Sequence, residues 1–162
     1  MKESELTGLY KHPKIKALIN ISHGEGFGLP IFEAAYSGLP VIAPGWSGQM
    51  DFLCDSKGKE QFYNVAFDIQ PIQKEVIWPG VLVEDSMWAH PRQSAAKKKM
   101  RECYENIVEN TGLVATSCEY ANILATRFEV SKQYAQFVSH VLPLEEMESI
   151  AQEIDDLLDD LV

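Results

Sequence analysis

The stretch that most restricts how this chain can fold is residues 16–48, where two short apolar runs flank a glycine-rich segment. Residues 16–21, KALINI, form an apolar run of the kind expected for a buried parallel strand. Pro30 then opens a helical segment and Gly38 follows its end, which is the usual placement of these residues around a helix. Residues 40–43, PVIA, indicate a second buried strand. This order predicts a β-α-β unit with parallel strands.

Beyond this unit the pattern is weaker, but it still indicates a mixture of strands and helices. Alternation over residues 64–69 favours a strand. Residues 70–90 contain Pro71, Pro79 and Gly80, with Pro91 just after, and are expected to form an irregular loop around a short strand at 81–83. We expect helices at 49–54 (a single turn), 94–110, 118–128 and 131–141. The predicted fold class is therefore α/β, with a Rossmann-like parallel sheet, flanking helices and further C-terminal helices.

The net charge of −10 is concentrated at one end of the chain of 162 residues. Residues 144–162 carry eight acidic and no basic side chains, which leaves a net charge of −2 on residues 1–143. A body so close to neutral lacks the clustered basic surface of a nucleic-acid-binding protein, so we expect no nucleic-acid partner. The basic run at 97–101 lies within a predicted helix and is interpreted as a solvated face.

The cysteines, the first residues and the length of the apolar runs bear on the cellular location of the protein. Three cysteines without C-x-x-C spacing favour neither a disulfide framework nor a structural zinc site. The first residues lack the apolar core of a secretion signal. No apolar run approaches the ~18 residues of a transmembrane helix, so no such segment is predicted. We expect a cytoplasmic protein.

Two regions are predicted, a Rossmann-like domain over residues 1–143 and an acidic amphipathic helix over residues 144–162. In the second region apolar residues recur at three- and four-residue steps. They are Leu144, Met147, Ile150, Ile154, Leu157, Leu158 and Leu161. Two roles stay open for this stripe: it covers surface of the domain, or it forms a seam for self-association.

The glycine-rich segment has the chemistry of an anion site. Gly24, Gly26 and Gly28 alternate between the end of a predicted strand and the start of a predicted helix. Glycines let backbone amides approach a ligand closely. The helix start adds unpaired N–H groups and the positive end of the helix dipole. Phosphate is the usual ligand of such a site.

Two common phosphate-binding patterns do not fit this segment. The dinucleotide-binding pattern G-x-G-x-x-G would need glycine where Leu29 or Ile31 stands. The P-loop needs a Gly-Lys-Ser/Thr sequence, and residues 18–56 contain no lysine. What remains is a phosphate-compatible loop with a carboxylate inside it.

Two acids accompany the loop, Glu25 within it and Glu33 in the helix that follows. A carboxylate beside a diphosphate is unfavourable unless it binds something else, and a vicinal diol is a natural partner for its two oxygens. A diphosphate flanked by two sugar diols is a nucleotide sugar.

Residues 25–34, EGFGLPIFEA, followed by GLPVIA at 38–43, resemble the retaining glycosyltransferases of family 4. Seven residues separate the two acids, as in the E-x7-E element of that family. Ser47 and Gly48 resemble its second glycine turn, and residues 87–91, MWAHP, resemble a later element that usually reads Trp-Ala-Glu-Pro. The resemblance is strong over residues 16–54, fair over 85–140 and absent beyond. It implies a GT-B fold, with this chain matching part of the C-terminal, donor-binding domain.

The resemblance also implies roles for individual residues. Glu25 is expected to contact the donor sugar, as the residue closest to catalysis, and Glu33 the ribose of the nucleotide. His23, just before the loop, and Gly24, its first glycine, complete the expected donor site. The amides expected to hold the diphosphate are those of Gly26, Phe27, Gly28 and Leu29.

Simpler interpretations of the same residues stay open. Glu33 is also an acid that the dipole would favour near a helix start, Glu25 is also a residue of an exposed turn, and His23 is equally suited to packing. The ring of Phe27 is expected to pack under the loop. A metal site built from the histidine and the two acids would leave the glycines without a purpose, so no metal is predicted.

The reaction implied by the resemblance transfers a glycosyl group from a nucleotide-diphosphate sugar to a hydroxyl of a glycan or other acceptor, with retention. The nucleotide sugar is the co-substrate, and no further cofactor is expected. Members of the family also have an acceptor-binding domain and upstream strands with basic residues, which this chain does not match. We therefore expect the chain alone to bind a nucleoside diphosphate weakly and to transfer no sugar. A non-catalytic nucleotide-sugar-binding module and a different Rossmann enzyme, such as a sugar-nucleotide epimerase, are the alternatives.

Overall fold

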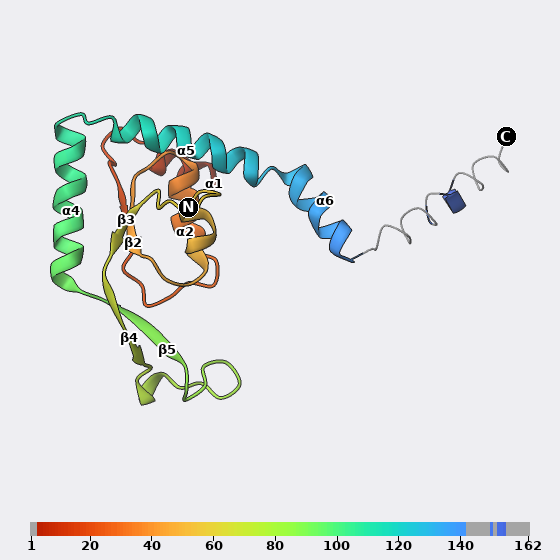
Figure 1. Ribbon diagram of the computed structural model, residues 1–162, viewed down its shortest axis with the longest axis horizontal. Helices are drawn as coiled ribbons and strands as arrows, with labels where there is room; N and C mark the ends of the chain where they lie inside the picture. Colours follow the sequence, from red (N-terminus) through yellow and green to blue (C-terminus); the bar gives the residue numbers. More distant parts are fainter. Residues whose placement is uncertain (1–2, 142–149, 151, 155–162) are drawn as a thin grey trace. The chain divides into compact units, whose positions relative to one another are not determined.

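The computed structural model describes residues 3–141, 150 and 152–154 (Figure 1). The chain divides into two compact units, Met1–Leu124 and Ala125–Val162, which are described separately. The predicted boundary at residues 143 and 144 lies outside the described residues, as does most of the predicted helix over 144–162. In that segment residues 150 and 152–154 are described, and they are helical.

A three-stranded parallel sheet forms the centre of the first unit. Its strands are β1 (Leu18–Ile19), β2 (Val41–Pro44) and β3 (Tyr63–Val65), in the order β1-β2-β3. Both neighbouring pairs are parallel. Helix α2 (Leu29–Tyr36) connects β1 to β2. The predicted β-α-β unit is confirmed, and all four residues of β2 are buried, as the continuous apolar run required.

Glycines and a proline define the ends of α2. Gly28 precedes the helix with φ of 84°, and Gly38 follows it with φ of 82°. Glycine adopts this left-handed conformation without the steric cost that other residues incur. Pro30 occupies the first turn, where no intrahelical N–H is needed. The face of α2 formed by Ile31 and its neighbours Ala34 and Ala35 is buried.

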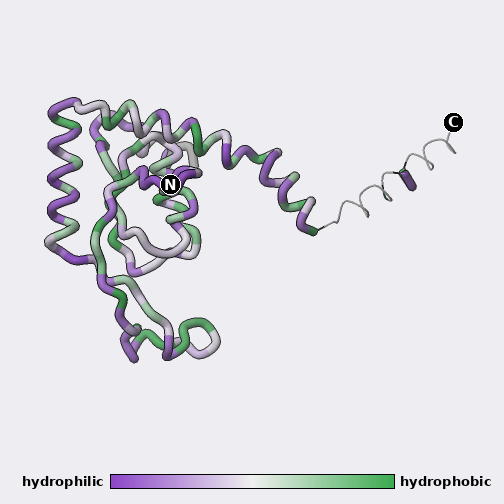
Figure 2. The backbone as a smooth tube through the Cα atoms, viewed as in Figure 1, coloured by the Kyte–Doolittle hydropathy of each residue, from purple (hydrophilic) through white to green (hydrophobic). Residues whose placement is uncertain are grey.

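Helix α4 (Gln93–Val108) packs against β2 and β3. Figure 1 shows α4 on one side of the sheet, and α2 with α1 (Glu3–Tyr10) on the other. Figure 2 shows α4 as predominantly hydrophilic, so only a narrow stripe of it enters the core. That stripe is buried with two strand residues, in a cluster of Ile42, Val65, Ala96 and Cys103. The result is an α/β fold with helices on both sides of a parallel sheet.

A second sheet contains β4 (Phe67–Pro71) and β5 (Met87–Pro91), paired antiparallel with Asp68 opposite His90. The prediction for this region was wrong in three respects. The strand expected at 64–69 is split at Ala66 into strands of two different sheets. The expected irregular loop contains β5, and residues 81–83 form no strand. The split redirects the chain from the parallel sheet into a two-stranded arm (Figure 1), a change that alternation alone does not reveal.

Short helical segments complete the first unit. The turn expected at 49–54 is present as η1 (Ser47–Gln49) and α3 (Met50–Leu53). Helix α5 (Leu113–Arg127) starts five residues before the predicted helix at 118–128. Its Tyr120 hydroxyl lies 2.9 Å from the Phe52 carbonyl and 3.0 Å from the Cys54 carbonyl, so it can donate to either.

In the second unit, helix α6 (Val130–Val141) matches the prediction for 131–141 within one residue. None of its side chains is buried. Its apolar residues are exposed at intervals of four, three and four positions, namely Val130, Tyr134, Phe137 and Val141.

Among the described residues, none of the helices is both long enough and apolar enough to span a bilayer.

Candidate functional site

The glycine-rich loop lies between the end of β1 and the start of α2, as predicted. Gly28 is the N-cap of α2, and no side chain caps this helix end. Among the described residues, no acceptor takes the N–H groups of Gly26, Gly28 or Leu29. Gly26 and Leu29 are also exposed. The loop therefore offers backbone donors to an external anion at the positive end of a helix dipole.

A second turn, which contains Ser47 and Gly48, supports the loop through hydrogen bonds. The Gly48 N–H donates to the Glu25 carbonyl at 3.2 Å, and the Ser47 hydroxyl donates to the same carbonyl at 2.6 Å. A Cβ on Gly48 would lie 1.8 Å from the Gly26 carbonyl oxygen, so only glycine fits at this position. These contacts fix the Glu25 carbonyl and bring the Gly26 carbonyl close to Gly48.

The carboxylate of Glu25 is held by Asn20, which follows β1. Asn20 Nδ2 donates to Glu25 Oε1 at 3.2 Å, and Asn20 Oδ1 accepts from the Ser22 N–H at 2.8 Å. The side chain of Glu25 is half-buried rather than fully solvated. Asn20 therefore orients this carboxylate within the loop, and no described residue bonds to its second oxygen.

Glu33 interacts with a different element. The Tyr10 hydroxyl of α1 donates to Glu33 Oε2 at 3.2 Å. Burial raises the pKa of Tyr10, and the neighbouring Glu33 carboxylate raises it further. Glu33 is the fifth residue of α2 and so lies beyond the first turn, where a dipole interaction would be strongest. The two acids thus have separate partners, and among the residues described no hydrogen bond joins either acid to the other's partner.

Glu33 lines a hollow of about 250 Å³ between α1 and α2. Aromatic rings and one lysine make up most of its wall, which consists of Leu6, Tyr10, Lys11, Phe32, Glu33, Tyr36 and Ser37. A hollow of this kind suits a flat or ring-shaped group that carries hydroxyls. Sequence reasoning identified Glu33 but missed Tyr10, because it predicted no helix over residues 3–10 and so no contact of α1 with α2.

The ring of Phe27 packs against two other aromatic rings. Its centroid lies 5.0 Å from that of Phe52 and 5.3 Å from that of Phe32. The side chain keeps 41% of its surface exposed, so the packing expected beneath the loop is partial. This cluster anchors the loop to α2 and α3.

His23 connects the loop to the arm formed by β4 and β5. Its Nδ1 lies 2.8 Å from the Ala89 carbonyl oxygen, and the Ala89 N–H donates to the His23 carbonyl at 3.0 Å. The imidazole stacks on Trp88 with an interplanar angle of 2° and lies 4.4 Å from His90, measured between ring centroids. The sequence motif at 87–91 was noted, but its contact with His23 depends on the unpredicted strand β5.

Trp46, the residue before Ser47 and Gly48, lies next to Gly24 and also contacts the arm formed by β4 and β5. A Cβ on Gly24 would be 3.6 Å from Trp46 Nε1, and the Trp46 ring lies 6.0 Å from Phe67. Three residues after Trp46, Gln49 is 1% exposed, and its amide nitrogen donates to the Pro44 carbonyl at 3.0 Å. The support of the site thus comes from β2, β4 and β5 as well as from α2.

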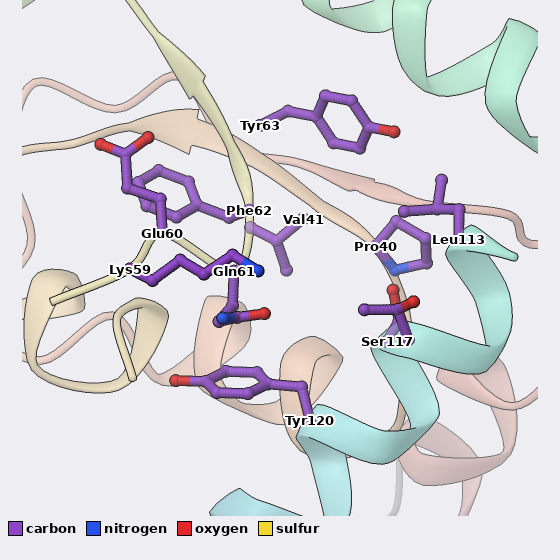
Figure 3. Close-up of a pocket in the computed structure, with 11 residues that line it drawn as sticks. Pro40, Val41, Lys59, Glu60, Gln61, Phe62, Tyr63, Leu113, Ser117 and Tyr120 are labelled. Carbon is purple, nitrogen blue, oxygen red and sulfur yellow. The ribbon is translucent and has the colours of Figure 1, made fainter. Parts of the chain in front are cut away.

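Other hollows lie away from the predicted residues. One of about 240 Å³ opens at the amino-terminal ends of β2 and β3, with Lys59 and Glu60 on one side and Ser117 and Tyr120 of α5 on the other (Figure 3). Another, of about 220 Å³, lies between the outer edge of β1 and α4 and is almost entirely apolar. None of the residues that the sequence predicted for the site lines either hollow.

Within the described part of the chain, no group of three or more His, Cys, Asp or Glu side chains is arranged to hold a metal ion.

Comparison with known proteins gives no match: no protein-family model, no curated protein and no solved structure is significantly similar to this chain. The class that the fold itself defines is a mixed α/β protein with a parallel sheet.

Proposed function

We propose that this chain is the donor-binding part of a retaining glycosyltransferase that uses a nucleotide-diphosphate sugar, with the Rossmann-like C-terminal domain of the GT-B fold. The observation that carries the proposal is the loop at 24–28. Within the described part of the chain, the N–H groups of Gly26, Gly28 and Leu29 have no acceptor, and they lie at an uncapped helix start in the connection from β1 to α2. A diphosphate needs several such donors at once.

The two acids support a ligand that has sugar rings on both sides of the diphosphate. Glu25 lies in the loop itself, and its orientation is set by Asn20. Glu33 lines the hollow beside α1, where its carboxylate already accepts from the hydroxyl of Tyr10. A ribose diol would replace that hydroxyl as donor. We therefore assign the donor sugar to Glu25 and the ribose to Glu33.

The loop would contribute to the reaction chiefly through electrostatics. As the bond between the anomeric carbon and the diphosphate breaks, negative charge develops on the leaving phosphate oxygen. Preorganised amides at a helix start stabilise that charge without reorganisation. Glu25 would position the sugar through its hydroxyls and would not act as a nucleophile.

Titration calorimetry with a set of related ligands tests the proposal. Inorganic pyrophosphate reports the loop alone, ADP adds a ribose with both hydroxyls, and 2′,3′-dideoxy-ADP removes them. We expect Glu33→Gln to lower ADP affinity by about tenfold or more, since a hydrogen bond to a charged group contributes about 1.5–3 kcal/mol. Pyrophosphate and dideoxy-ADP should bind Glu33→Gln and the unmodified chain equally.

Glu75→Gln is the matched control, because Glu75 is an exposed acid in the loop between β4 and β5. It should leave all three affinities unchanged. Equal ADP affinity in Glu33→Gln and the unmodified chain would remove the ribose assignment. Failure of every diphosphate to bind would overturn the proposed function.

A further inference from the structure

We propose that helix α6 pairs in antiparallel orientation with α6 of a second copy of this chain, through a row of apolar side chains on one face. This row, the α6 stripe, consists of Val130, Tyr134, Phe137 and Val141. The inference is independent of the proposed function, because α6 belongs to the second compact unit and every residue assigned to the donor site belongs to the first.

The spacing of the α6 stripe is that of a helix face that packs on another helix. Its members follow one another at intervals of four, three and four residues, which are the intervals of the a and d positions in paired helices. The two inner rings are largely uncovered, with Tyr134 68% and Phe137 64% exposed. A helix of 12 residues is marginally stable alone and normally depends on packing of its apolar face.

The order of residues along the α6 stripe favours a second copy as the partner. A valine stands at each end and an aromatic ring at each inner position, so the stripe has the same pattern in both directions. When two such helices run antiparallel about a two-fold axis, Val130 of one copy lies opposite Val141 of the other. Tyr134 then lies opposite Phe137 in both halves of the contact. A two-fold interface requires this self-complementarity.

The polar residues of α6 fit a protein partner better than a lipid surface. A helix that binds lipid usually has several lysines or arginines on its polar face. Helix α6 contains one lysine and no arginine, and this Lys132 forms an ion pair with Glu129 at 3.3 Å. The α6 stripe is therefore apolar without a basic border.

The acidic residues that follow α6 favour the antiparallel orientation. Residues 144–162 carry eight acidic and no basic side chains. A parallel pair would bring both acidic segments to the same end of the contact. An antiparallel pair places them at opposite ends of a helix of 12 residues, about 18 Å apart. That separation is about twice the Debye length at physiological ionic strength, so their repulsion is largely screened.

The area of the contact determines how strong the pairing can be. A fully covered aromatic ring buries about 150–250 Å², and about two-thirds of each ring in the α6 stripe is open to a partner. The four rings of a pair then bury about 400–700 Å², and the valines bring the total close to the ~1,000 Å² of a specific interface. We therefore expect a weak dimer, with a dissociation constant on the order of 10–100 µM.

Sedimentation velocity of the full chain, at concentrations below and above that range, tests the pairing. Phe137→Ala and Tyr134→Ala should each weaken the dimer by about tenfold or more, because central aromatic residues carry most of the energy of an interface. Alanine is the best helix former, so both variants should keep α6 helical. Tyr104→Ala is the matched control, because the Tyr104 side chain on α4 is equally exposed, at 67%. It should leave the dissociation constant unchanged.

Paired charges at the ends of the α6 stripe test the orientation. Val130→Lys combined with Val141→Glu sets opposite charges against each other in an antiparallel pair and should retain the dimer. Val130→Lys combined with Val141→Lys sets like charges against each other and should prevent it. In a parallel pair both double variants would place like charges together.

A chain that stays monomeric at every concentration would overturn this inference, and so would a dimer that Phe137→Ala leaves equally strong. Loss of the dimer in both double variants would overturn the antiparallel pairing. A monomeric chain that binds phosphatidylserine vesicles, and loses this binding in Phe137→Ala, would overturn the inference in favour of a lipid surface. None of these results depends on diphosphate binding at the loop.

Discussion

At the scale of single residues, the site depends on how closely two turns approach each other. Gly48 lies directly under the Gly26 carbonyl, and the Glu25 carbonyl receives two hydrogen bonds from the same turn. These contacts hold the loop against the turn at residues 47–48, while Gly26 and Leu29 stay exposed. A loop with the same glycines but without this support would not hold its amides in one arrangement.

Gly48→Ala should therefore damage the site by steric conflict. A Cβ at 1.8 Å from a backbone oxygen forces the two turns apart, and conflicts of this kind cost about 1–3 kcal/mol. We expect the free energy of unfolding in urea to fall by that amount and pyrophosphate affinity to fall with it. Gly26→Ala is the control, because nothing lies within 4 Å of its added Cβ. Equal stability of the two variants would contradict this account of the loop.

At the scale of elements, the site is assembled by contacts between segments far apart in the chain. The arm of β4 and β5 reaches the loop through Ala89, and α1 reaches α2 through Tyr10. Helix α5 is attached by Tyr120, whose hydroxyl meets the carbonyls of Phe52 and Cys54 at the end of α3. Because the Phe27 ring packs on Phe52, that attachment also bears on the loop.

Tyr120→Phe tests how much this attachment contributes. The substitution removes the hydroxyl donor from two carbonyls in a largely buried setting, which should cost about 1–2 kcal/mol of unfolding free energy in urea. Tyr104→Phe is the matched control, since the Tyr104 side chain is 67% exposed, and it should change stability by less than about 0.5 kcal/mol. A Tyr120→Phe variant as stable as this control would show that packing alone holds α5.

At the scale of the whole molecule, the two compact units differ in how much they bury. The first contains the sheet, the core cluster and every residue of the proposed site. In the second, none of the described side chains is buried. Burial of apolar surface is the main source of stability, so the first unit is expected to account for most of it.

Ending the chain after Phe128 should therefore leave the first unit almost unchanged. We expect its unfolding free energy to differ from that of the full chain by less than about 0.5 kcal/mol. The measurement is urea unfolding followed by tryptophan fluorescence, since Trp46, Trp78 and Trp88 all lie before residue 125. A loss of more than about 1 kcal/mol would mean that residues 129–162 stabilise the first unit.

Local patterns were sufficient for the β-α-β unit and for most of the helices. Continuous apolar runs predicted β1 and β2, and the placement of Pro30 and Gly38 predicted α2, because these features act within a few residues. The strand β5 was not predictable in the same way. Its pairing partner β4 precedes it in the chain, and residues 72–86 separate the two strands. Pairing between distant segments leaves little trace in either one.

By itself, the sequence determined the parallel β-α-β unit, the glycine-rich loop with one acid inside it, and the second acid in the helix that follows. The tertiary structure decided which groups these residues meet: Asn20 for Glu25, Tyr10 for Glu33, and Ala89 with Trp88 for His23. The physical reason is that backbone conformation follows from neighbours in the chain. The partners of a side chain are selected by packing between elements, which no local pattern encodes.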